Sequence, residues 1–372
     1  MRVLITGANG FVGKNLIVHL GEREDVEVFR FSRDDDPKAL TDLVAQADFI
    51  FHLAGVNRPQ DPTEFKTGNT DLTRLLSEAI VACGRKIPLI YTSSTQAEQG
   101  NAYGFSKRGA EDVLRRLAAD YGSPVHIFRL PNVFGKWARP NYNSAIATFC
   151  HNIARGLPIQ INDPSALMTL VYIDDVVKSF MGVMDDAKTS GLFVEVEPQY
   201  QMTVGELSDK LHAFRVSRDT LITDAVGKGL TRALYSTYLS YLPPENFTYE
   251  VPKYGDPRGV FVEMLKTPDA GQFSYFTAHP GITRGGHYHH SKTEKFLVIK
   301  GEACFRFRQI VSGEFYELFT KGDKPEIVET VPGWTHDVTN IGNDEMIVML
   351  WANEIFDREC PDTYAMPVGT EA

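Results

Sequence analysis

The hydrophobic pattern of this chain changes about two-thirds of the way along its 372 residues. Up to about residue 180, short runs rich in β-branched and aromatic residues alternate with amphipathic stretches of helical period. The runs typical of strands are Val3–Ile5, Val26–Phe31, Phe49–Leu53, Leu89–Tyr91 and Val125–Phe128. Helical periodicity is found over residues 70–82 and 107–121. Regular alternation of strands and helices predicts a parallel sheet with helices on both faces.

Beyond Pro243 and Pro244 the chain has short strand-like runs and no long helical stretch. These runs, which glycine turns separate, are residues 259–264, 272–276, 295–299, 304–308, 326–329 and 346–351. The pattern predicts an antiparallel barrel or jelly roll. We therefore expect an N-terminal α/β domain over residues 1–243 and an all-β domain over residues 244–372, because a chain of this length suits two cores.

Three glycines form the first turn of the expected parallel sheet. Gly7, Gly10 and Gly13 follow the first strand directly and lead into an amphipathic segment. In dinucleotide sites the first glycine permits a tight turn, the second lets a pyrophosphate approach the backbone, and the third lets the helix pack closely. The helix N-terminus then presents unpaired N–H groups to the phosphates. The glycines alone are weak evidence, but their position between a strand and a helix predicts a bound dinucleotide.

The residues after the second strand bear on which nicotinamide cofactor is used. NAD sites usually place an acidic residue on the adenosine ribose at this point. Here the strand ends in Phe31-Ser32-Arg33, and an arginine can hold the 2′-phosphate of NADPH. NADPH is therefore favoured, although the acidic run 34–36 follows at once and weakens the argument. The alternative is that this segment is only a solvated charged loop.

A tyrosine, a lysine and a serine are candidates for the catalytic chemistry. Tyr103 and Lys107 are four residues apart and share a helix face, and Ser94 ends the preceding strand. A tyrosine hydroxyl has an ordinary pKa of about 10, so it needs a nearby cation to exchange protons at neutral pH. Lys107 can supply that cation, while Ser94 can hydrogen-bond a reacting carbonyl or alcohol. The spacing is common by chance, and it gains meaning only beside the glycine turn.

Histidines cluster in the C-terminal third of the chain. His287, His289 and His290 precede Glu294, and His336 follows much later. In a strand His287 and His289 would point to the same face. Three imidazoles and one carboxylate suit zinc or another first-row divalent metal. We therefore predict His287, His289, Glu294 and His336 as metal ligands, although His290 offers a second register for the cluster.

The N-terminal part resembles the extended short-chain dehydrogenase/reductase family over about residues 1–240. The features that carry the resemblance are the glycine turn, the run 52–55, Ser94 with Tyr103 and Lys107, and the segments 129–135 and 171–176. The family implies NAD(P) on the glycine loop, Tyr103 as proton donor or acceptor, Lys107 on the nicotinamide ribose, and a small C-terminal lobe over the substrate. The implied fold is a doubly wound Rossmann-type sheet with that substrate lobe.

Residue by residue, this resemblance assigns two groups of site residues. The cofactor-binding group is Gly7, Gly10, Phe11, Val12, Gly13, Arg33, Leu53, Ala54, Gly55, Tyr103 and Lys107. The substrate-binding group is Arg58, Ser94, Asn132 and Asn143. The role of Asp174 and Asp175 is open: they either contact the substrate or simply cap the helix that follows them.

The C-terminal part resembles the metal-binding cupins, which are jelly-roll domains. The spacing from Gly281 through His287 and Glu294 to Gly301 matches the first cupin motif, and the segment 332–340 matches the second. One departure is that Pro332 stands directly before a glycine rather than two residues before it, which leaves the His336 position intact. The segment 256–263 also resembles the start of sugar-nucleotide 3,5-epimerases of the cupin fold.

Taken together, the two halves resemble bifunctional capsular polysaccharide synthesis enzymes. That resemblance implies that the cupin epimerises C3 of a UDP-2-acetamido-2,6-dideoxy-4-keto-hexose. The N-terminal domain then reduces C4 with NADPH to UDP-2-acetamido-2,6-dideoxy-L-talose. One alternative is a single-activity nucleotide-sugar reductase or 4-epimerase whose cupin dimerises or senses a ligand, and another is a non-catalytic binding protein. The sequence leaves open whether the metal is catalytic or structural and which residue is the C3 base.

Composition excludes several other classes of function. The net charge of −10 argues against nucleic-acid binding, because no basic stripe is available for phosphates. No apolar run is long enough to span a bilayer, and the four widely spaced cysteines suggest neither a disulfide framework nor a thiolate zinc site. We therefore expect a cytoplasmic protein without membrane or nucleic-acid partners. The family resemblance and the edges of the barrel favour a homodimer.

Overall fold

The computed structural model describes residues 1–186, 191–252, 254–256, 259–261, 264–267, 271–354, 356–357 and 359–369. Contacts divide the chain into two compact units. The first unit combines Met1–Ser144 with Leu167–Met202, and the second combines Ala145–Ala166 with the chain from Thr203 onward. Among the described residues, no helix is both long and apolar enough to cross a membrane.

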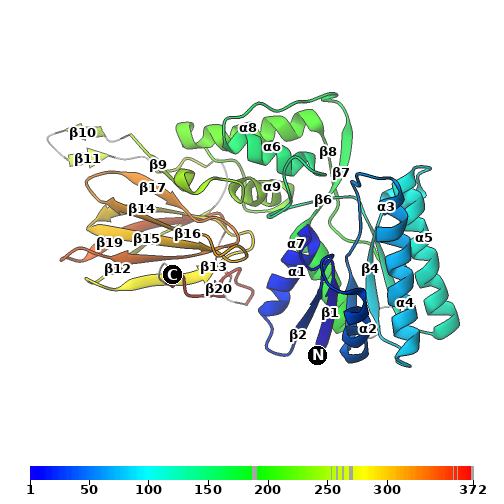
Figure 1. Cartoon of the computed structure of the whole chain (residues 1–372). Helices are drawn as coiled ribbons and strands as arrows, with labels where there is room; N and C mark the ends of the chain where they lie inside the picture. The colour runs from blue at the N-terminus through cyan, green and yellow to red at the C-terminus, as the bar shows by residue number, and fades with distance from the viewer. Residues whose placement is uncertain are drawn as a thin grey trace. The chain divides into compact units, whose positions relative to one another are not determined.

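A five-stranded parallel sheet forms the centre of the first unit (Figure 1). Its strands are β1 (Arg2–Thr6), β2 (Glu27–Phe31), β3 (Phe49–His52), β4 (Leu89–Ser94) and β5 (Val125–Leu130), in the order β2-β1-β3-β4-β5. Every residue of β3 and all but the last of β4 are buried, because parallel strands of this kind are covered on both faces. The parallel sheet with its doubly wound helices confirms the predicted Rossmann-type fold class, and its order, 2-1-3-4-5, is the second common order of such sheets.

Helices cover both faces of this sheet (Figure 1). One face carries α1 (Phe11–Gly21) and α7 (Ile173–Asp185), and the other carries α2 (Pro37–Gln46), α4 (Leu72–Ala82) and α5 (Ala102–Arg116). On the second face Leu4 of the sheet belongs to one apolar cluster with Leu40 of α2 and Leu76 of α4. On the first face the ring of Phe180 lies 4.8 Å from the ring of Phe128. The doubly wound arrangement therefore has a packed core on each side.

Short elements complete the first unit. They are α3 (Thr63–Phe65), the π-helical turns η1 (Lys66–Asp71) and η3 (Leu117–Tyr121), the 3₁₀ turn η2 (Thr95–Glu98), and a small sheet of β6 (Asn132–Phe134), β7 (Leu167–Tyr172) and β8 (Tyr200–Thr203). The helix predicted over residues 107–121 begins earlier, at Ala102, because the side chain of Asn101 caps it by accepting the Gly104 N–H at 2.7 Å. Tyr103 consequently lies in the first turn of α5.

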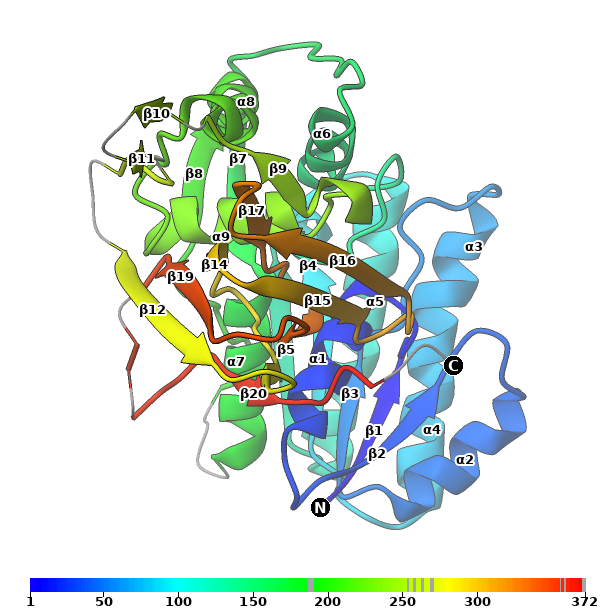
Figure 2. The ribbon, with the colours of Figure 1, turned by 90° about the vertical axis from the view of Figure 1, so that its left-hand side faces the viewer.

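The second unit contains an antiparallel barrel (Figures 1 and 2). One sheet has the order β12-β19-β14-β17-β9, and the other has the order β16-β15-β18-β13-β20. The strands are β9 (Thr248–Glu250), β12 (Gln272–Ala278), β13 (Thr283–Tyr288), β14 (Glu294–Lys300), β15 (Glu302–Gln309), β16 (Phe315–Lys321), β17 (Glu326–Glu329), β18 (Trp334–Asn340), β19 (Met346–Ala352) and β20 (Tyr364–Ala365). This confirms the predicted all-β jelly-roll domain.

The remaining elements of the second unit are mostly helical. They are α6 (Ala145–Ala154), α8 (Val204–Thr220), α9 (Gly229–Leu239), the 3₁₀ turn η4 (Pro244–Asn246), and a separate hairpin of β10 (Tyr254–Asp256) and β11 (Gly259–Phe261). The boundary predicted at residue 243 falls inside this unit, because contacts group the three helices with the barrel strands. The boundary marks a change of periodicity in the sequence, and it stays a prediction.

A buried charged cluster ties the helices to the barrel. Lys295 of β14 and Glu329 of β17 form an ion pair, and each residue is only 1% exposed. Arg218 of α8 approaches the other carboxylate oxygen of Glu329 at 2.9 Å. The Lys295 ammonium also donates to the hydroxyl of Tyr249 on β9 at 3.0 Å. Two buried cations therefore depend on a single carboxylate.

Replacing that carboxylate should destabilise the second unit. The substitution Glu329→Gln keeps the size of the side chain but leaves Lys295 and Arg218 without their anionic partner. The expected loss is about 3–5 kcal/mol of unfolding free energy, which is typical of breaking a buried ion pair by removing one partner. Urea unfolding would measure it, with Glu250→Gln, an exposed carboxylate on β9, as the matched control. Equal midpoints for the two variants would contradict the prediction.

Candidate functional site

The loop between β1 and α1 has no room for a side chain at Gly7 or Gly13. Gly7 adopts a φ of +72°, and a Cβ placed on it would lie 2.7 Å from the backbone of Ala54. A Cβ on Gly13 would lie 2.4 Å from the carbonyl oxygen of Gly7. Gly10 caps α1 without a side-chain hydrogen bond, and the first turn, which begins with Phe11 and Val12, has no acidic residue. The loop therefore leaves backbone N–H groups for an anion and fits the pyrophosphate of a dinucleotide.

The segment after β3 lies against this loop. The ring of His52 connects the Thr6 hydroxyl, at 2.7 Å from Nδ1, with the Thr73 hydroxyl, at 2.8 Å from Nε2. Burial lowers the pKa of His52 to about 3, and the charge of Lys107 adds to the effect. His52 is therefore neutral and links β1, β3 and α4 through hydrogen bonds. The half-buried residues Leu53 and Ala54 follow it directly.

Gly55 brings this segment next to the catalytic candidates. A Cβ on Gly55 would lie 3.0 Å from the Lys107 ammonium and 2.8 Å from the side-chain oxygen of Asn69. Asn69, buried in η1, accepts the Val56 N–H at 2.8 Å and donates to the Val56 carbonyl at 2.9 Å. Its amide also donates to the Ser106 hydroxyl on α5 at 2.9 Å. Asn69 thus fixes the 53–56 loop to the helix that carries Lys107.

The structure brings Ser94, Tyr103 and Lys107 together. The side chain of Ser94 interacts with the Tyr103 hydroxyl, and the Lys107 ammonium lies 6.0 Å from the Tyr103 ring centroid. Burial raises the pKa of Tyr103, whereas the interaction with Ser94 acts in the opposite direction. Tyr103 is therefore protonated at neutral pH, and its hydroxyl can donate a proton.

Lys107 is a buried cation held by a backbone carbonyl. Its ammonium donates to the Thr92 carbonyl at 2.9 Å and is only 5% exposed. Burial lowers its pKa to about 8, while Glu111, one helical turn further, acts to raise it. Glu111 is itself fully buried, accepts from the Ser93 hydroxyl at 2.6 Å, and forms a two-pronged ion pair with Arg129. Lys107 is consequently charged at neutral pH and loses its charge in mildly basic solution.

Arg33 lies in the loop that follows β2. Its side chain is 82% exposed and forms an ion pair with Glu64 at 3.1 Å. Two of the acidic residues after it have structural partners: Asp35 accepts the Ser32 N–H at 2.6 Å, and Asp36 caps α2 by accepting the Lys38 N–H at 2.9 Å. These aspartates shape the loop, which leaves the guanidinium of Arg33 as its exposed cation.

The other predicted substrate-binding residues lie at exposed positions of the first unit. Arg58 follows β3, Asn132 begins β6, and Asn143 lies in the segment after it. The Asn132 amide donates to the Thr169 carbonyl at 3.0 Å. Within the described part of the chain, none of the three joins the contacts among Ser94, Tyr103 and Lys107. Their substrate roles stay predictions.

Sequence reasoning missed several residues that shape this site. Asn69, Glu111 and the pair of Lys136 with Asp174 had no recognised signal. The ammonium of Lys136, only 1% exposed, lies 2.7 Å from Asp174 Oδ1 in the first turn of α7. Asp174, considered as a helix cap or a substrate contact, therefore has a buried lysine as its partner. The position of Lys136 directly after the segment 129–135 was the one hint in the sequence.

In the barrel the structure brings His287, His289, Glu294 and His336 together. One nitrogen or oxygen from each lies within 4.8 Å of the others. His289 Nε2 is 3.2 Å and His336 Nε2 is 3.5 Å from the same oxygen of Glu294. His290 lies instead against the ring of Tyr364, with centroids 4.9 Å apart. Of the possible ligand sets, the geometry therefore favours the one that contains His287 and His289.

The ionisation of this cluster suits a divalent cation. Burial, together with His336 and His289, lowers the pKa of His287 to about 3, so that its imidazole is neutral and can ligate. Burial opposes ionisation of Glu294, but the nearby side chains of His289, His336 and Lys292 outweigh it and hold its pKa well below the ordinary value. Three imidazoles and one carboxylate from β13, its following turn, β14 and β18 match the donor set of a zinc-type site.

A cavity adjoins the cluster inside the second unit. Its volume is about 200 Å³, and its lining residues are Ser274, Lys292, Glu294, Leu350, Ala352, Glu354 and Phe356. The ammonium of Lys292 lies 2.8 Å from Glu294 Oε1, the oxygen that faces away from the histidines. The cavity therefore combines an apolar wall with charged groups next to a candidate metal ligand. Of the segment 256–263, which resembles 3,5-epimerases, residues 257–258 and 262–263 lie outside the described residues.

Comparisons with known proteins cover both units. Residues 3–194 match the NAD dependent epimerase/dehydratase family, and residues 254–364 match the polysaccharide biosynthesis C-terminal domain. A curated relative from Pseudomonas aeruginosa, UDP-2-acetamido-2,6-beta-L-arabino-hexul-4-ose reductase, is 66% identical over 372 residues and 100% of each chain. The fold of the first unit is shared with UDP-glucose 4-epimerase from Thermotoga maritima, at 21% identity, a TM-score of 0.52, and coverage of 57% of this chain and 82% of that one.

The whole chain also matches a solved two-domain structure. The crystal structure of the capsular polysaccharide assembling protein CapF from Staphylococcus aureus is 42% identical, with a TM-score of 0.69. The match covers 99% of this chain and 100% of that chain. The resemblance seen in the sequence is thereby confirmed for the complete architecture. The chain belongs to the NAD dependent epimerase/dehydratase family, and within it to the two-domain proteins that include CapF.

Proposed function

We propose that this protein is an NADPH-dependent nucleotide-sugar reductase that also epimerises its substrate. The observation that carries the reductase is the contact of Ser94 with Tyr103 beside the buried cation of Lys107, next to a glycine loop that fits a dinucleotide. The reductase from Pseudomonas aeruginosa, at 66% identity, supports a UDP-linked 2-acetamido-2,6-dideoxy-4-keto-hexose as substrate. The product is then UDP-2-acetamido-2,6-dideoxy-L-talose, a precursor for a surface polysaccharide.

Three side chains of the first unit have separate roles in the proposed reduction. NADPH, when bound on the glycine loop, supplies the hydride for C4 of the sugar. Ser94 hydrogen-bonds the C4 carbonyl, and the Tyr103 hydroxyl donates its proton to the oxygen as negative charge develops there. The Lys107 cation stabilises the tyrosinate that remains. Each group lies on a rigid element, the end of β4 or one face of α5.

The barrel is proposed to epimerise C3 before C4 is reduced. A hydrogen on C3 is acidic only while C4 is a ketone, because the neighbouring oxygen then carries the charge. Epimerisation must therefore precede reduction. A divalent metal such as zinc, held by His287, His289, Glu294 and His336, would polarise the carbonyl or would only stabilise the barrel. The second candidate function is a single-activity reductase whose barrel serves dimerisation or ligand sensing.

A tyrosine substitution separates the two activities. Tyr103→Phe removes the proton donor but leaves the barrel unchanged. We expect reduction to fall by about 10²–10⁴-fold, as for the loss of a general acid. Exchange of solvent deuterium into C3 of the keto sugar should continue at the wild-type rate. Mass spectrometry of the sugar and NADPH absorbance measure the two steps, with Tyr121→Phe as control. Loss of both activities would contradict the assignment.

Histidine substitutions in the barrel test the epimerase. His287→Ala or His336→Ala should abolish deuterium exchange at C3 and release bound metal, because each removes a candidate ligand. The exposed His279 provides the control, since His279→Ala removes an imidazole outside the cluster. Metal content and exchange are measured on the same full-length preparations. Exchange that persists in both variants would favour the single-activity alternative.

The charge of Lys107 should set the basic limb of the pH profile. Its ammonium, with a pKa of about 8, is present below that pH and is lost above it. Because the cation stabilises the tyrosinate, kcat/KM for reduction should be flat near neutrality and fall about tenfold per pH unit above 8. Initial rates of NADPH oxidation between pH 6 and about 10, with cofactor affinity measured in parallel, check this. A profile that stays flat to the basic end would refute the role.

Arg33 should set the preference for NADPH over NADH. Removing the guanidinium in Arg33→Ala deletes a charged hydrogen bond to the 2′-phosphate, which is worth about 1.5–3 kcal/mol, or roughly 10–100-fold in affinity. NADH binding should stay unchanged. Titration of protein fluorescence with each cofactor measures both affinities. Glu64→Gln is the matched control, because it frees Arg33 from its ion pair and should not weaken the binding of NADPH. An unchanged ratio of NADPH affinity to NADH affinity in Arg33→Ala would disprove the assignment.

A further inference from the structure

The turn between β13 and β14 connects two of the candidate metal ligands. His289 stands at its start, directly after β13, and Glu294 is the first residue of β14. The N–H groups of such a turn have no ladder partners, so each needs another acceptor. Side-chain oxygens supply them: Asn353 accepts the Thr293 N–H at 3.0 Å, and Thr330 accepts the Glu294 N–H at 2.9 Å. These two N–H groups are therefore paired by side chains, while the carbonyls of His289 and Thr293 accept from the backbone N–H groups of Gly333 and Asn353.

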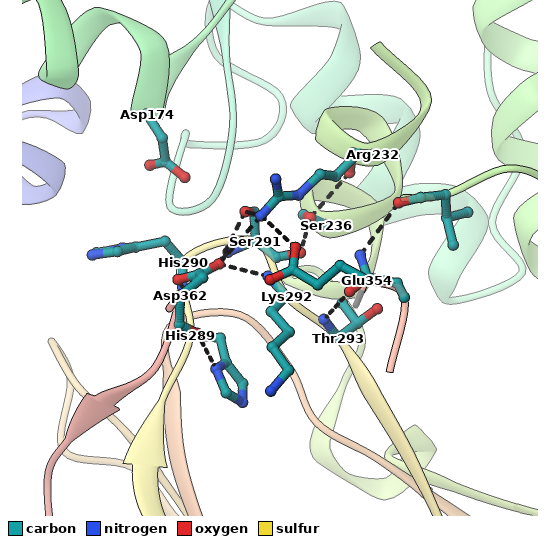
Figure 3. Close-up of polar contacts among 12 residues, drawn as sticks. Asp174, Arg232, Ser236, His289, His290, Ser291, Lys292, Thr293, Glu354 and Asp362 are labelled. Atoms are coloured by element: carbon teal, nitrogen blue, oxygen red, sulfur yellow. Dashed lines mark hydrogen bonds and ion pairs between the residues drawn. The ribbon is translucent and has the colours of Figure 1, made fainter. Parts of the chain in front are cut away.

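Asp362 holds the rest of the turn, as Figure 3 shows. Its Oδ1 accepts the His290 N–H at 2.8 Å, and its Oδ2 accepts the N–H groups of Ser291 and Lys292, each at 2.7 Å. The Ser291 hydroxyl donates to the same Oδ2 at 3.0 Å. One half-buried carboxylate thus binds three consecutive backbone N–H groups between the two ligands.

The backbone of Asp362 also orients a ligand directly. Its carbonyl oxygen lies 2.5 Å from His289 Nδ1. A carbonyl can only accept, so Nδ1 carries the proton and the lone pair of Nε2 is left for a metal. That Nε2 is the atom that faces Glu294 at 3.2 Å. Asp362 therefore fixes both the backbone next to His289 and the tautomer of its ring.

The segment that carries Asp362 has anchors of its own. β20 pairs with β13, placing Ala365 opposite His287 and Tyr364 opposite Tyr288. Beyond it, the Met366 N–H donates to the Gly286 carbonyl at 2.8 Å, and the Arg308 guanidinium donates to the Val368 carbonyl at 2.7 Å. Loss of the Asp362 carboxylate alone should therefore leave this segment in place.

We propose that Asp362 is a positioning residue of the metal centre, holding His289 and the turn to Glu294 in ligating geometry. This inference rests on the proposed metal site. Outer partners that orient a metal-bound histidine typically contribute about 10–100-fold to metal affinity. In this protein that contribution comes from Asp362, a residue 73 positions after His289 along the chain, whose carboxylate and carbonyl act together.

The test is metal affinity in Asp362→Asn of the full-length protein. An amide cannot replace this carboxylate, because its NH₂ group would face N–H donors on one side. We expect the affinity for Zn²⁺ to fall by about tenfold or more in competition with a chromogenic chelator. The absorption spectrum of bound Co²⁺ should also change, since it reports the ligand geometry. Glu359→Gln, an exposed acid of the same segment, should leave both unchanged.

A second control separates positioning from general stability. Val348→Ala removes core volume in β19, where Val348 is fully buried, and lowers stability without touching the ligand turn. Equal losses of Zn²⁺ affinity in Val348→Ala and Asp362→Asn, or a wild-type affinity in Asp362→Asn, would overturn the positioning role. If Asp362→Asn does not fold, Asp362→Glu keeps the charge but displaces it, and a smaller loss is expected. A wild-type protein that binds no Zn²⁺ would overturn the metal site itself.

Discussion

The close approach of two backbone segments sets the geometry of the N-terminal site. The turn at Gly7 lies so near Ala54 that a Cβ would be 2.7 Å from its backbone, and this fixes the loop after β1 against the loop after β3. Asn69 extends the arrangement by holding Val56 through both its N–H and its carbonyl. Since Gly55 then abuts Lys107, the glycine loop and helix α5 are positioned by one continuous set of contacts.

The barrel depends on a different kind of constraint, which is that one buried carboxylate needs polar or charged partners. Glu294 meets His289 and His336 through one oxygen and Lys292 through the other. A carboxylate this deeply buried is costly unless such partners surround it. The histidines bring no net charge while they are neutral, so Lys292 is the cation that contacts Glu294 directly, and a bound metal would add a second positive charge at the same residue.

The sequence predicted the parts of the fold and site that depend on local pattern. The periodicity of the hydrophobic residues and the glycine turns predicted the α/β sheet and the all-β barrel. The spacing of Tyr103 and Lys107 predicted that both lie on one helix. The choice between His289 and His290 could not follow from alternation, because β13 ends at Tyr288 and its register shifts between Gly285 and His287. Partners such as Asn69 and Asp362 had no signal, because they bind backbone groups of a distant segment and no period or spacing marks them.

Both sites share a physical principle that explains this difference. Three of the candidate site residues, Ser94, His289 and Glu294, stand at or next to the ends of strands, where the backbone loses its ladder partners. A side chain from elsewhere must then supply the missing hydrogen bonds: Asn69 does so for Val56, and Asp362 does so for residues 290–292. Such side chains make the ends of strands rigid without extending the sheet, so that His289 and Glu294 can face each other across a turn. The geometry of each candidate site therefore depends on polar residues that have no role in the proposed chemistry.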